Sequence, residues 1–200
     1  MKELDLETVK AKLKKASVGI AGLGGLGSNV AMALARAGIG RLVIVDFDDV
    51  EESNLNRQAY TVDQVGMRKT EALIQNISKA NPVVDVTAFH LKLEAGNMDA
   101  PFGSVDIVIE ALDSAETKAL FIEEIAAKLP SKPIIVASGV AGIRGTERIQ
   151  MRKSGNLYLV QDENAPSCYD AAVLAPKVGL FAHWQASLAL EILLEGEDVD

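Results

Sequence analysis

The architecture of this chain can be read outward from VGIAGLGGLG, residues 18–27. Its apolar first half is typical of a buried strand, and its second half spaces glycines as Gly22-x-Gly24-x-x-Gly27. At a strand-to-helix turn, the first glycine allows the tight turn, the second lets a phosphate approach the backbone, and the third lets helix and strand pack closely. Since the start of a helix presents unpaired N–H groups and the positive end of its dipole, the stretch predicts a phosphate-binding turn.

Strands and helices alternate beyond this turn. Continuous apolar runs bounded by glycine, proline and polar residues predict strands buried on both faces, as in a parallel sheet. Segments between them predict helices, the first ended by Gly38 and Gly40 and the second by Asn81-Pro82. The expected strands are 17–21, 42–45, 84–89, 105–110 and 133–137, and the expected helices are 25–37, 69–79, 115–128 and 178–194.

The pattern changes after Gly145. Segments 146–152 and 156–160 are typical of antiparallel strands around Lys153-Ser154-Gly155. The chain therefore predicts an α/β fold with a doubly wound, mostly parallel, Rossmann-like sheet and an antiparallel C-terminal extension. We expect a single domain over residues 1–200, in which residues 1–16 form an N-terminal helical arm.

Composition narrows the possible functions. The 200 residues include 20 basic and 28 acidic side chains, and this net charge of −8 argues against a nucleic-acid partner. No apolar run reaches the length of a membrane span, and the charged N-terminus lacks the apolar core of a signal peptide, so we expect a cytoplasmic protein without membrane contact. Cys168 is the sole cysteine, which excludes an internal disulfide and a four-cysteine zinc site.

Polar residues follow the second strand at positions that suit a nucleotide. Asp46 lies at its carboxyl end, 24 residues after Gly22, where a carboxylate can accept both ribose hydroxyls. The segment EESNLNRQ then places Asn54, Arg57 and Gln58 just past that strand. A dehydrogenase has no obvious need for an arginine here, whereas an enzyme that handles a triphosphate does.

Lys69 and Asp113 each have an ordinary and a functional interpretation. A lone lysine, like a lone arginine, is typical of a solvated surface, and Asp113 in ALDSAETK is typical of a helix N-cap. Yet Asp113 also follows an apolar strand at its carboxyl end, where ligands bind open α/β sheets. Cations beside a nucleotide turn stabilise phosphate charge and a spare carboxylate can hold Mg²⁺, so the set predicts ATP.

The run GLGGLGSNVAMALARAGIGRLVIVDFDDVEESNLNRQ (22–58) resembles the ThiF/MoeB/HesA superfamily, and the resemblance extends over residues 17–196. Its members are related to the adenylating core of ubiquitin-activating enzymes. The resemblance implies ATP-dependent adenylation of the C-terminal Gly-Gly carboxylate of a small β-grasp sulfur carrier protein. The length and the missing zinc cysteines make the chain most similar to the shorter ThiF-type branch, which adenylates the carrier ThiS in thiamine thiazole synthesis.

The resemblance implies a role for each matching residue. The glycines lie along the nucleotide, Asp46 holds the ribose, Arg57 contacts the triphosphate, and Asp113 binds Mg²⁺, with Ser114 in place of the family's asparagine. The implied nucleotide-binding residues are Gly22, Gly24, Gly27, Asp46, Ser53, Asn54, Arg57, Gln58, Lys69 and Asp113. The implied catalytic residues are Arg57, Lys69, Asp113 and Cys168.

Cys168 lies in NAPSCYDAAVLAPKVGLFA (164–182), which resembles a passage whose cysteine, in some family members, bonds covalently to the sulfurated carrier. Cys168 is therefore either a sulfur-relay thiol or an inert, packed side chain. The family's zinc-binding CxxC pairs and the rhodanese domain of some relatives are missing, so we expect no zinc and a separate sulfur donor. Homodimeric relatives also insert an N-terminal arginine into the partner's ATP site. Residues 1–17 hold no arginine, so either a lysine replaces it, or the arginine donor is missing from this chain, or the chain is not used in that way. The lysines are Lys2, Lys10, Lys12, Lys14 and Lys15.

Other functions stay open at this point. A nicotinamide-dependent oxidoreductase would share the glycine turn and Asp46, but it leaves Arg57, Lys69 and Asp113 unexplained. A MoeB-like adenylyltransferase of molybdopterin synthesis fits the same motifs. So does a tRNA-modifying relative, although the acidic net charge disfavours tRNA. A nucleotide-binding scaffold without catalytic activity would bind ATP and show no exchange.

The final helix bears on assembly. Phe181, Trp184, Leu188 and Ile192 share one face at helical spacing, which, with the family's habit, predicts a homodimer. His90 is expected at a strand end, and His183 and Trp184 are expected to pack or to lie at an interface rather than to catalyse.

Overall fold

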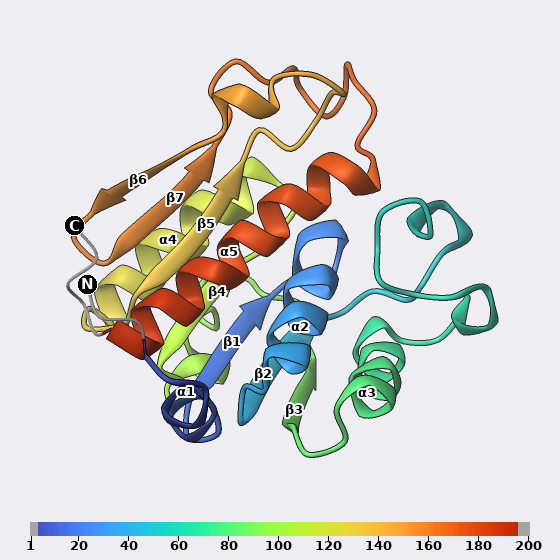
Figure 1. Cartoon of the computed structure of the whole chain (residues 1–200). Helices are drawn as coiled ribbons and strands as arrows, with labels where there is room; N and C mark the ends of the chain where they lie inside the picture. Colours follow the sequence, from blue (N-terminus) through green and yellow to red (C-terminus); the bar gives the residue numbers. More distant parts are fainter. Residues whose placement is uncertain (1–3, 196–200) are drawn as a thin grey trace.

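Seven strands form one sheet in the computed structural model, which describes residues 4–195 (Figure 1). The strand order is β3-β2-β1-β4-β5-β7-β6, and every neighbouring pair is parallel except the edge pair β6 and β7. The order reverses between β1 and β4, so a crevice is expected where these two strands end. The strands are β1 (Ser17–Ala21), β2 (Arg41–Asp46), β3 (Asp85–His90), β4 (Ile107–Glu110), β5 (Ile134–Ser138), β6 (Gln150–Ser154) and β7 (Leu157–Gln161).

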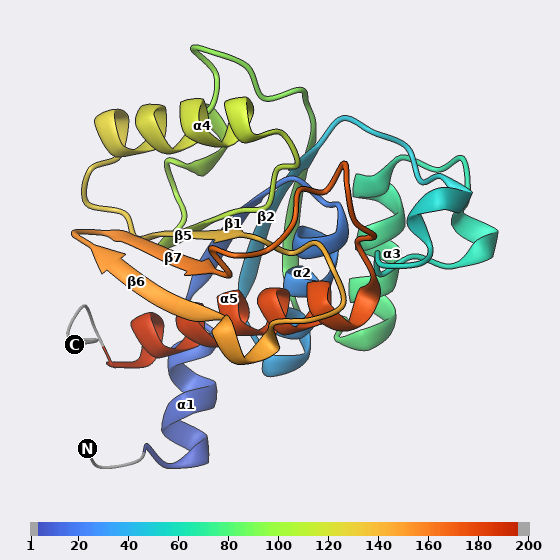
Figure 2. The same cartoon turned by 90° about the horizontal axis from the view of Figure 1, so that it is seen from above.

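Helices cover both faces of the sheet (Figure 2). One face carries α1, α2, α3 and α5, and the other carries α4. The α-helices are α1 (Leu6–Leu13), α2 (Gly25–Ala37), α3 (Lys69–Ala80), α4 (Ala115–Lys128) and α5 (Ala175–Glu195). Short 3-10 helices are η1 (Glu52–Asn54), η2 (Val62–Gln64), η3 (Ala100–Phe102) and η4 (Thr146–Arg148). The predicted Rossmann-like, doubly wound fold is confirmed.

Alternate residues of the central strands divide between two apolar clusters, one on each face. Ile20 and Ile109 pack in the cluster that includes α2 and α5, whereas Ala21 and Val108 pack in the cluster of Phe121 from α4. A strand covered on both faces needs apolar residues at consecutive positions. This is why the central strands appear in the sequence as continuous apolar runs.

The C-terminal hairpin differs from the prediction in three respects. The strand expected over 146–152 is wrong at its start, because Gly145 takes a left-handed conformation (φ 86°) and residues 146–148 form η4. The turn is Gly155-Asn156, since Ser154 pairs with Leu157, and Gly155 supplies the positive φ of 57° that two-residue hairpins favour. The antiparallel extension consists of β6 alone, because β7 runs parallel to β5.

Other boundaries shift by small amounts. The strand expected over 105–110 is shorter, with β4 beginning at Ile107. The last helix begins at Ala175 instead of 178, since Pro176 fits within the first turn, where its missing N–H has no helical partner to lose. Helix α2 matches its predicted range of 25–37. It ends at Gly38 with φ 93°, the left-handed cap expected of glycine.

The apolar face of α5 packs inside its own chain. Phe181, Leu188 and Ile192 are buried in the core, and Trp184 is half-buried against the same cluster. Because this face covers the sheet of its own chain, it lends no support to the expected homodimer, which stays a prediction. Although α5 is 21 residues long, none of the helices described combines the length and apolar character needed to cross a membrane.

The N-terminal arm contains one helix, α1, capped by the side chain of Asp5. Lys12 Nζ donates to the carbonyl of Leu194 at 2.5 Å, which joins α1 to the end of α5 (Figure 1). This places the arm at the amino edge of the sheet, where β1 begins. The lysines of α1 therefore lie far from the carboxyl edge of their own sheet, and Lys2 lies outside the described residues.

Candidate active site

A cleft of about 970 Å³ opens at the carboxyl edge of the sheet. One part is formed by the turn after β1 and the segment after β2, and another by segments 138–141 and 161–169. The turn after β4 also lines it. Of the residues singled out from the sequence, those lining the cleft are Gly22, Gly24, Asp46, Asn54, Arg57, Gln58, Lys69, Asp113 and Cys168. Gly27 and Ser53 are not among the lining residues.

The three glycines of the turn differ in how much space the fold leaves for a side chain. A Cβ on Gly22 would lie 2.7 Å from the carbonyl oxygen of Ala111, and its φ is +87°. A Cβ on Gly27 would collide with the carbonyl oxygen of Gly22. At Gly24 the nearest atom is Gln58 Nε2, 3.9 Å away, so the fold itself leaves room for a side chain there. The space next to Gly24 belongs to the cleft, as expected of a cradle that a ligand fills.

The start of α2 adjoins this space. Its N-cap is Gly24, and no side chain caps its first turn. Gly24, Gly25 and Leu26 line the cleft, and the unpaired N–H groups of a helix start suit an anion. The local geometry thus fits the phosphates of a nucleotide.

Asp46 joins two loops of the cleft. Its Oδ2 accepts a hydrogen bond from the Leu23 N–H at 2.6 Å, and its Oδ1 accepts one from the Asp48 N–H at 2.8 Å. Burial raises the pKa of Asp46, while the nearby Lys69 cation and these N–H donors oppose that rise. Each carboxylate oxygen still has acceptor capacity, so the side chain can hold ribose hydroxyls as well as the two loops.

Lys69 has a partner that the sequence analysis missed. It is buried at the start of α3, and its Nζ lies 2.6 Å from Asp48 Oδ2. The backbone N–H of Lys69 also donates to the Asp48 carbonyl at 3.0 Å. A buried ammonium needs such a partner. The sequence did offer a sign that Asp48 lies at the cleft, because Asp48 follows Asp46 by two residues and so projects from the same end of β2.

Segment 51–58 divides into residues that shape the loop and residues that face the cleft. Asn54 Oδ1 accepts from the Glu51 N–H at 3.1 Å and closes the capping box of η1. Arg57 Nη1 donates to the Ser53 carbonyl at 3.0 Å and to Asn56 Oδ1 at 2.8 Å. These contacts of Ser53 and Asn54 stabilise the shape of the loop. Arg57 is half-buried and lines the cleft.

Gln58 supplies a buried acceptor. Its side-chain Oε1 is buried and has no hydrogen-bond partner within the described part of the chain. Buried polar atoms in folded proteins nearly always have a partner, and this one belongs to a residue of the cleft wall, so it suits a ligand that donates to it. The cleft therefore fits a polar ligand on an observation independent of the glycine turn.

Asp113 is exposed in the turn after β4 and lines the cleft. The alternative that it caps α4 is wrong, because the N-cap is Ser114, whose Oγ accepts from the Thr117 N–H at 3.4 Å. The carboxylate of Asp113 is thus available to a ligand. Mg²⁺ commonly takes one or two carboxylates together with substrate phosphates, and Asp113 fits that requirement.

A buried ion pair supports this turn. Glu110, fully buried at the end of β4, accepts from Lys118 Nζ at 2.8 and 2.9 Å and from the Leu112 N–H at 2.6 Å. Lys118 also donates to the Ala137 carbonyl at 3.3 Å, which joins the ends of β4 and β5. Sequence reasoning missed the pair. Its effect is to fix the backbone immediately before Asp113.

Cys168 lies on the segment between β7 and α5. Its side chain is a free thiol, exposed, and among the lining residues of the cleft. The interpretation of Cys168 as a packed core residue is therefore wrong. The thiol has the access that a nucleophile needs.

The histidines lie elsewhere. His183 Nδ1 is 2.8 Å from the Gly179 carbonyl of its own helix, and His90 is the last residue of β3. Neither is among the residues lining the cleft. Within residues 4–195, no three His, Cys, Asp or Glu side chains gather as a metal site.

Known proteins resemble this chain in sequence. The chain is 33% identical over 195 residues to the adenylyltransferase and sulfurtransferase MOCS3 of Aedes aegypti, covering 94% of this chain and 44% of that protein. It is 35% identical over 190 residues to the adenylyltransferase and sulfurtransferase UBA4 of Kluyveromyces lactis, covering 92% and 42%. The chain thus spans less than half the length of these curated relatives.

A solved structure agrees in fold. The tRNA N6-threonylcarbamoyladenosine dehydratase TcdA of E. coli, in complex with AMP, superposes with a TM-score of 0.84 at 25% identity, covering 94% of this chain and 89% of that one. The model of the ThiF family matches residues 3–199, nearly the whole sequence. The resemblance to the ThiF/MoeB superfamily is confirmed, and the chain belongs to the ThiF family.

Proposed function

We propose that this protein uses Mg-ATP to adenylate the C-terminal glycine carboxylate of a small β-grasp sulfur carrier ending in Gly-Gly, with residues 1–200 acting as one adenylation domain. The observation that carries the proposal is the content of the cleft. A glycine turn open at Gly24, the carboxylate of Asp46, the cation of Lys69 and the exposed carboxylate of Asp113 meet there. A dehydrogenase would use the first two, would need Lys69 only as the partner of Asp48, and would leave Asp113 without a role.

The chemistry needs no nucleophile from the protein. The carrier's carboxylate, ionised at neutral pH, attacks the α-phosphorus of ATP. A bond from the carboxylate oxygen to that phosphorus forms, the bond to the departing pyrophosphate breaks, and an acyl-adenylate results. Catalysis is then positioning and charge stabilisation. Arg57 and Lys69 stabilise the phosphates, Asp113 holds Mg²⁺, and Asp46 holds the ribose.

The finer assignment is ThiS in thiamine thiazole synthesis. Its support is the likeness to the ThiF-type branch, based on the single cysteine of this sequence in place of the zinc-binding CxxC pairs. A carrier of molybdopterin synthesis is the alternative within the same chemistry. We also propose a separate sulfur donor and a homodimer. The dimer rests on the habit of the family, and sedimentation at micromolar concentration tests it.

A second candidate is ATP-dependent modification of tRNA. It is favoured by the structural likeness to TcdA, a tRNA N6-threonylcarbamoyladenosine dehydratase. The net charge of −8 weighs against it, because RNA binding relies on a basic surface. We therefore place it second.

Pyrophosphate exchange tests the proposal. With a Gly-Gly-ending carrier present, we expect the protein to incorporate labelled pyrophosphate into ATP, because acyl-adenylate formation is reversible. ThiS-like and MoaD-like carriers form separate arms, and a carrier lacking its last two glycines is the control. The absence of exchange with both carriers rejects adenylation of a carrier, and tRNA-dependent ATP turnover would then favour the second candidate.

Cys168 belongs to the later, sulfur-transfer half of the chemistry. Cys168→Ser should leave pyrophosphate exchange within about twofold of wild type, since adenylation needs no thiol. If the exposed thiol takes part in sulfur transfer, the same substitution lowers thiocarboxylate yield with a separate sulfur donor and abolishes any reducible adduct with the carrier. Ser167→Ala on the same segment is the control. An unimpaired thiocarboxylate yield in Cys168→Ser removes the relay role and leaves the adenylation proposal intact.

A further inference from the structure

A buried charge cluster lies in the cleft wall formed by segments 138–141 and 161–169. At its centre is Asp162, which follows β7 and whose side chain is 0% exposed. It accepts from Lys177 Nζ at 3.1 Å and from Arg148 Nε and Nη2 at 3.1 and 3.2 Å. Burial alone raises the pKa of Asp162, but the hydrogen bonds from Arg148 and Lys177 outweigh it and lower the pKa, so the carboxylate stays ionised. The adenylation chemistry gives none of the three a role.

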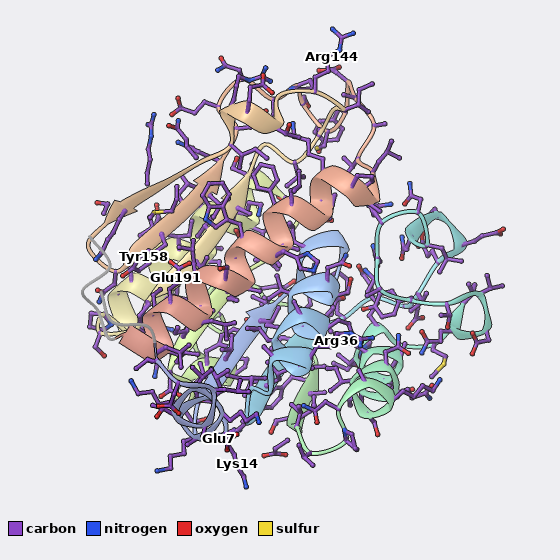
Figure 3. All side chains as sticks on the ribbon, in the orientation of Figure 1. Glu7, Lys14, Arg36, Arg144, Tyr158 and Glu191 are labelled. Carbon is purple, nitrogen blue, oxygen red and sulfur yellow. The ribbon has the colours of Figure 1, made fainter. Side chains whose placement is uncertain are left out.

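Lys177 extends the cluster to the loop after β5. Its side chain is 4% exposed, and its Nζ donates to the carbonyls of Ala141 at 2.8 Å and Arg144 at 3.2 Å as well as to Asp162. An ammonium has three donors, so all three are used. The side chain of Arg144 points outward from the loop (Figure 3), and it is the backbone of Arg144 that is held.

The loop over residues 139–145 needs such an anchor. It reads GVAGIRG, and Gly139, Gly142 and Gly145 have φ of 83°, 84° and 86°. Glycines give a loop the widest backbone freedom, so a glycine-rich loop keeps one shape only where other groups hold it. The hydrogen bonds from Lys177 fix two of its carbonyls across three residues.

The same cluster reaches the segment that carries Cys168. Asp162 Oδ1 accepts from the Asn164 N–H at 3.2 Å, and its carbonyl accepts from the Ala165 N–H at 3.1 Å. The Gly142 N–H donates to the carbonyl of Ala172 at 2.9 Å, which joins the loop to the far end of that segment. One cluster thus sets the shape of both strips of backbone that line this wall.

Stability alone is a weak reason for such a cluster. Replacing a buried ion pair with apolar side chains of similar volume is often neutral or stabilising, whereas a buried pair can specify one conformation. The opposite wall uses other contacts, because Asp46 binds the backbone at Leu23 and Asp48, and Lys69 binds Asp48. The cluster therefore acts on one wall of the cleft and not on the nucleotide-binding wall.

We propose that Lys177 is a positioning residue that holds the 139–145 loop and the 163–173 segment in the shape that receives the C-terminal tail of the acyl-group substrate. The proposal rests on the adenylation function for the identity of that substrate. The effect of Lys177 on the loop does not depend on that identity and can be measured without any substrate.

The test uses Lys177→Met, which keeps most of the side-chain volume and leaves Asp162 paired with Arg148. In pyrophosphate exchange we expect the KM for a Gly-Gly carrier to rise at least about 10-fold, since a small misplacement of a binding surface has effects of this size or larger. The KM for ATP should stay within about twofold. Lys132→Met is the matched control, because Lys132 Nζ donates to the Val105 carbonyl at the other edge of the sheet. It should change neither KM.

Hydrogen exchange without substrates gives the second readout. Amides of residues 139–145 should exchange faster in Lys177→Met, while those of residues 22–27 keep the wild-type rate. An unchanged carrier KM, an equal rise in both KM values, or unchanged exchange in the loop overturns the proposal. If Lys177→Met does not fold, Lys177→Gln, which keeps a polar end and removes the ammonium that binds Ala141, Arg144 and Asp162, takes its place with the same criteria. Wild-type protein that shows no pyrophosphate exchange refutes the adenylation function instead, and the loop measurement still decides the role of Lys177.

Discussion

Asp113→Asn is expected to lower pyrophosphate exchange by roughly 100-fold or more, the effect of losing one preorganised electrostatic contact. Asparagine keeps the shape of the side chain and removes the charge that Mg²⁺ requires. The melting temperature should change by less than about 3 °C, because Ser114 caps α4 and an exposed charge near a helix start contributes little. The measurements are exchange rate against Mg²⁺ concentration and thermal unfolding.

Glu116→Gln is the matched control for Asp113. Glu116 is an exposed acidic residue in the first turn of the same helix, and it does not line the cleft. Its neutralisation has the same effect on the helix dipole but should leave exchange at the wild-type rate. Equal activity of Asp113→Asn and Glu116→Gln would mean that Asp113 does not hold the metal. A large loss in both would mean that general charge near α4 matters.

Gly27→Ala should lower the stability of the fold, whereas Gly24→Ala should lower the affinity for ATP. Gly27→Ala drives a Cβ into the carbonyl oxygen of Gly22, and neither backbone segment can move without separating α2 from β1. We expect a loss of at least about 4 kcal/mol of unfolding free energy, the range of severe core defects, or a melting temperature lower by about 10 °C or more. Thermal unfolding and soluble yield measure it.

Gly24→Ala is expected to fold with a nearly normal melting temperature and to bind ATP weakly. A Cβ at Gly24 would lie 3.9 Å from the nearest atom, Gln58 Nε2, so the methyl group meets no clash within the fold. The added methyl group occupies the space that phosphates need, so the rise in melting temperature caused by saturating ATP should largely disappear. Gly103→Ala, in open space away from the cleft, is the control and should keep that rise. A normal ATP response in Gly24→Ala would show that no phosphate approaches this backbone.

The layered α/β architecture and the position of the nucleotide turn were predictable from the sequence alone. Both depend on local patterns: consecutive apolar residues for a strand covered on two faces, and glycines where a Cβ would strike the backbone. The structure shows Gly22 and Gly27 to be required for such local reasons. Asp46 was predictable for the same reason, because a residue at the end of a parallel strand projects into the crevice at the carboxyl edge.

Which side chains pair across the fold could not be predicted and is visible only in the three-dimensional structure. No local sequence pattern predicts the buried ion pairs. These are Asp48 with Lys69, Glu110 with Lys118, and Asp162 with Arg148 and Lys177. A charged residue in a sequence is compatible with solvent, a cap or a buried pair, and packing selects among them. The same holds for Asp113 and Ser114, either of which could cap a helix until the backbone dihedrals place Ser114 at the N-cap.

The face of α5 gives the same lesson for assembly. Phe181, Leu188 and Ile192 form an apolar stripe whose spacing indicates only that it packs against another apolar surface. The sequence cannot distinguish a second chain from the chain's own sheet, because burial of apolar area is non-directional and either surface satisfies it. The tertiary structure shows the stripe packed against the sheet and α2, so the chain's own core accounts for its apolar character.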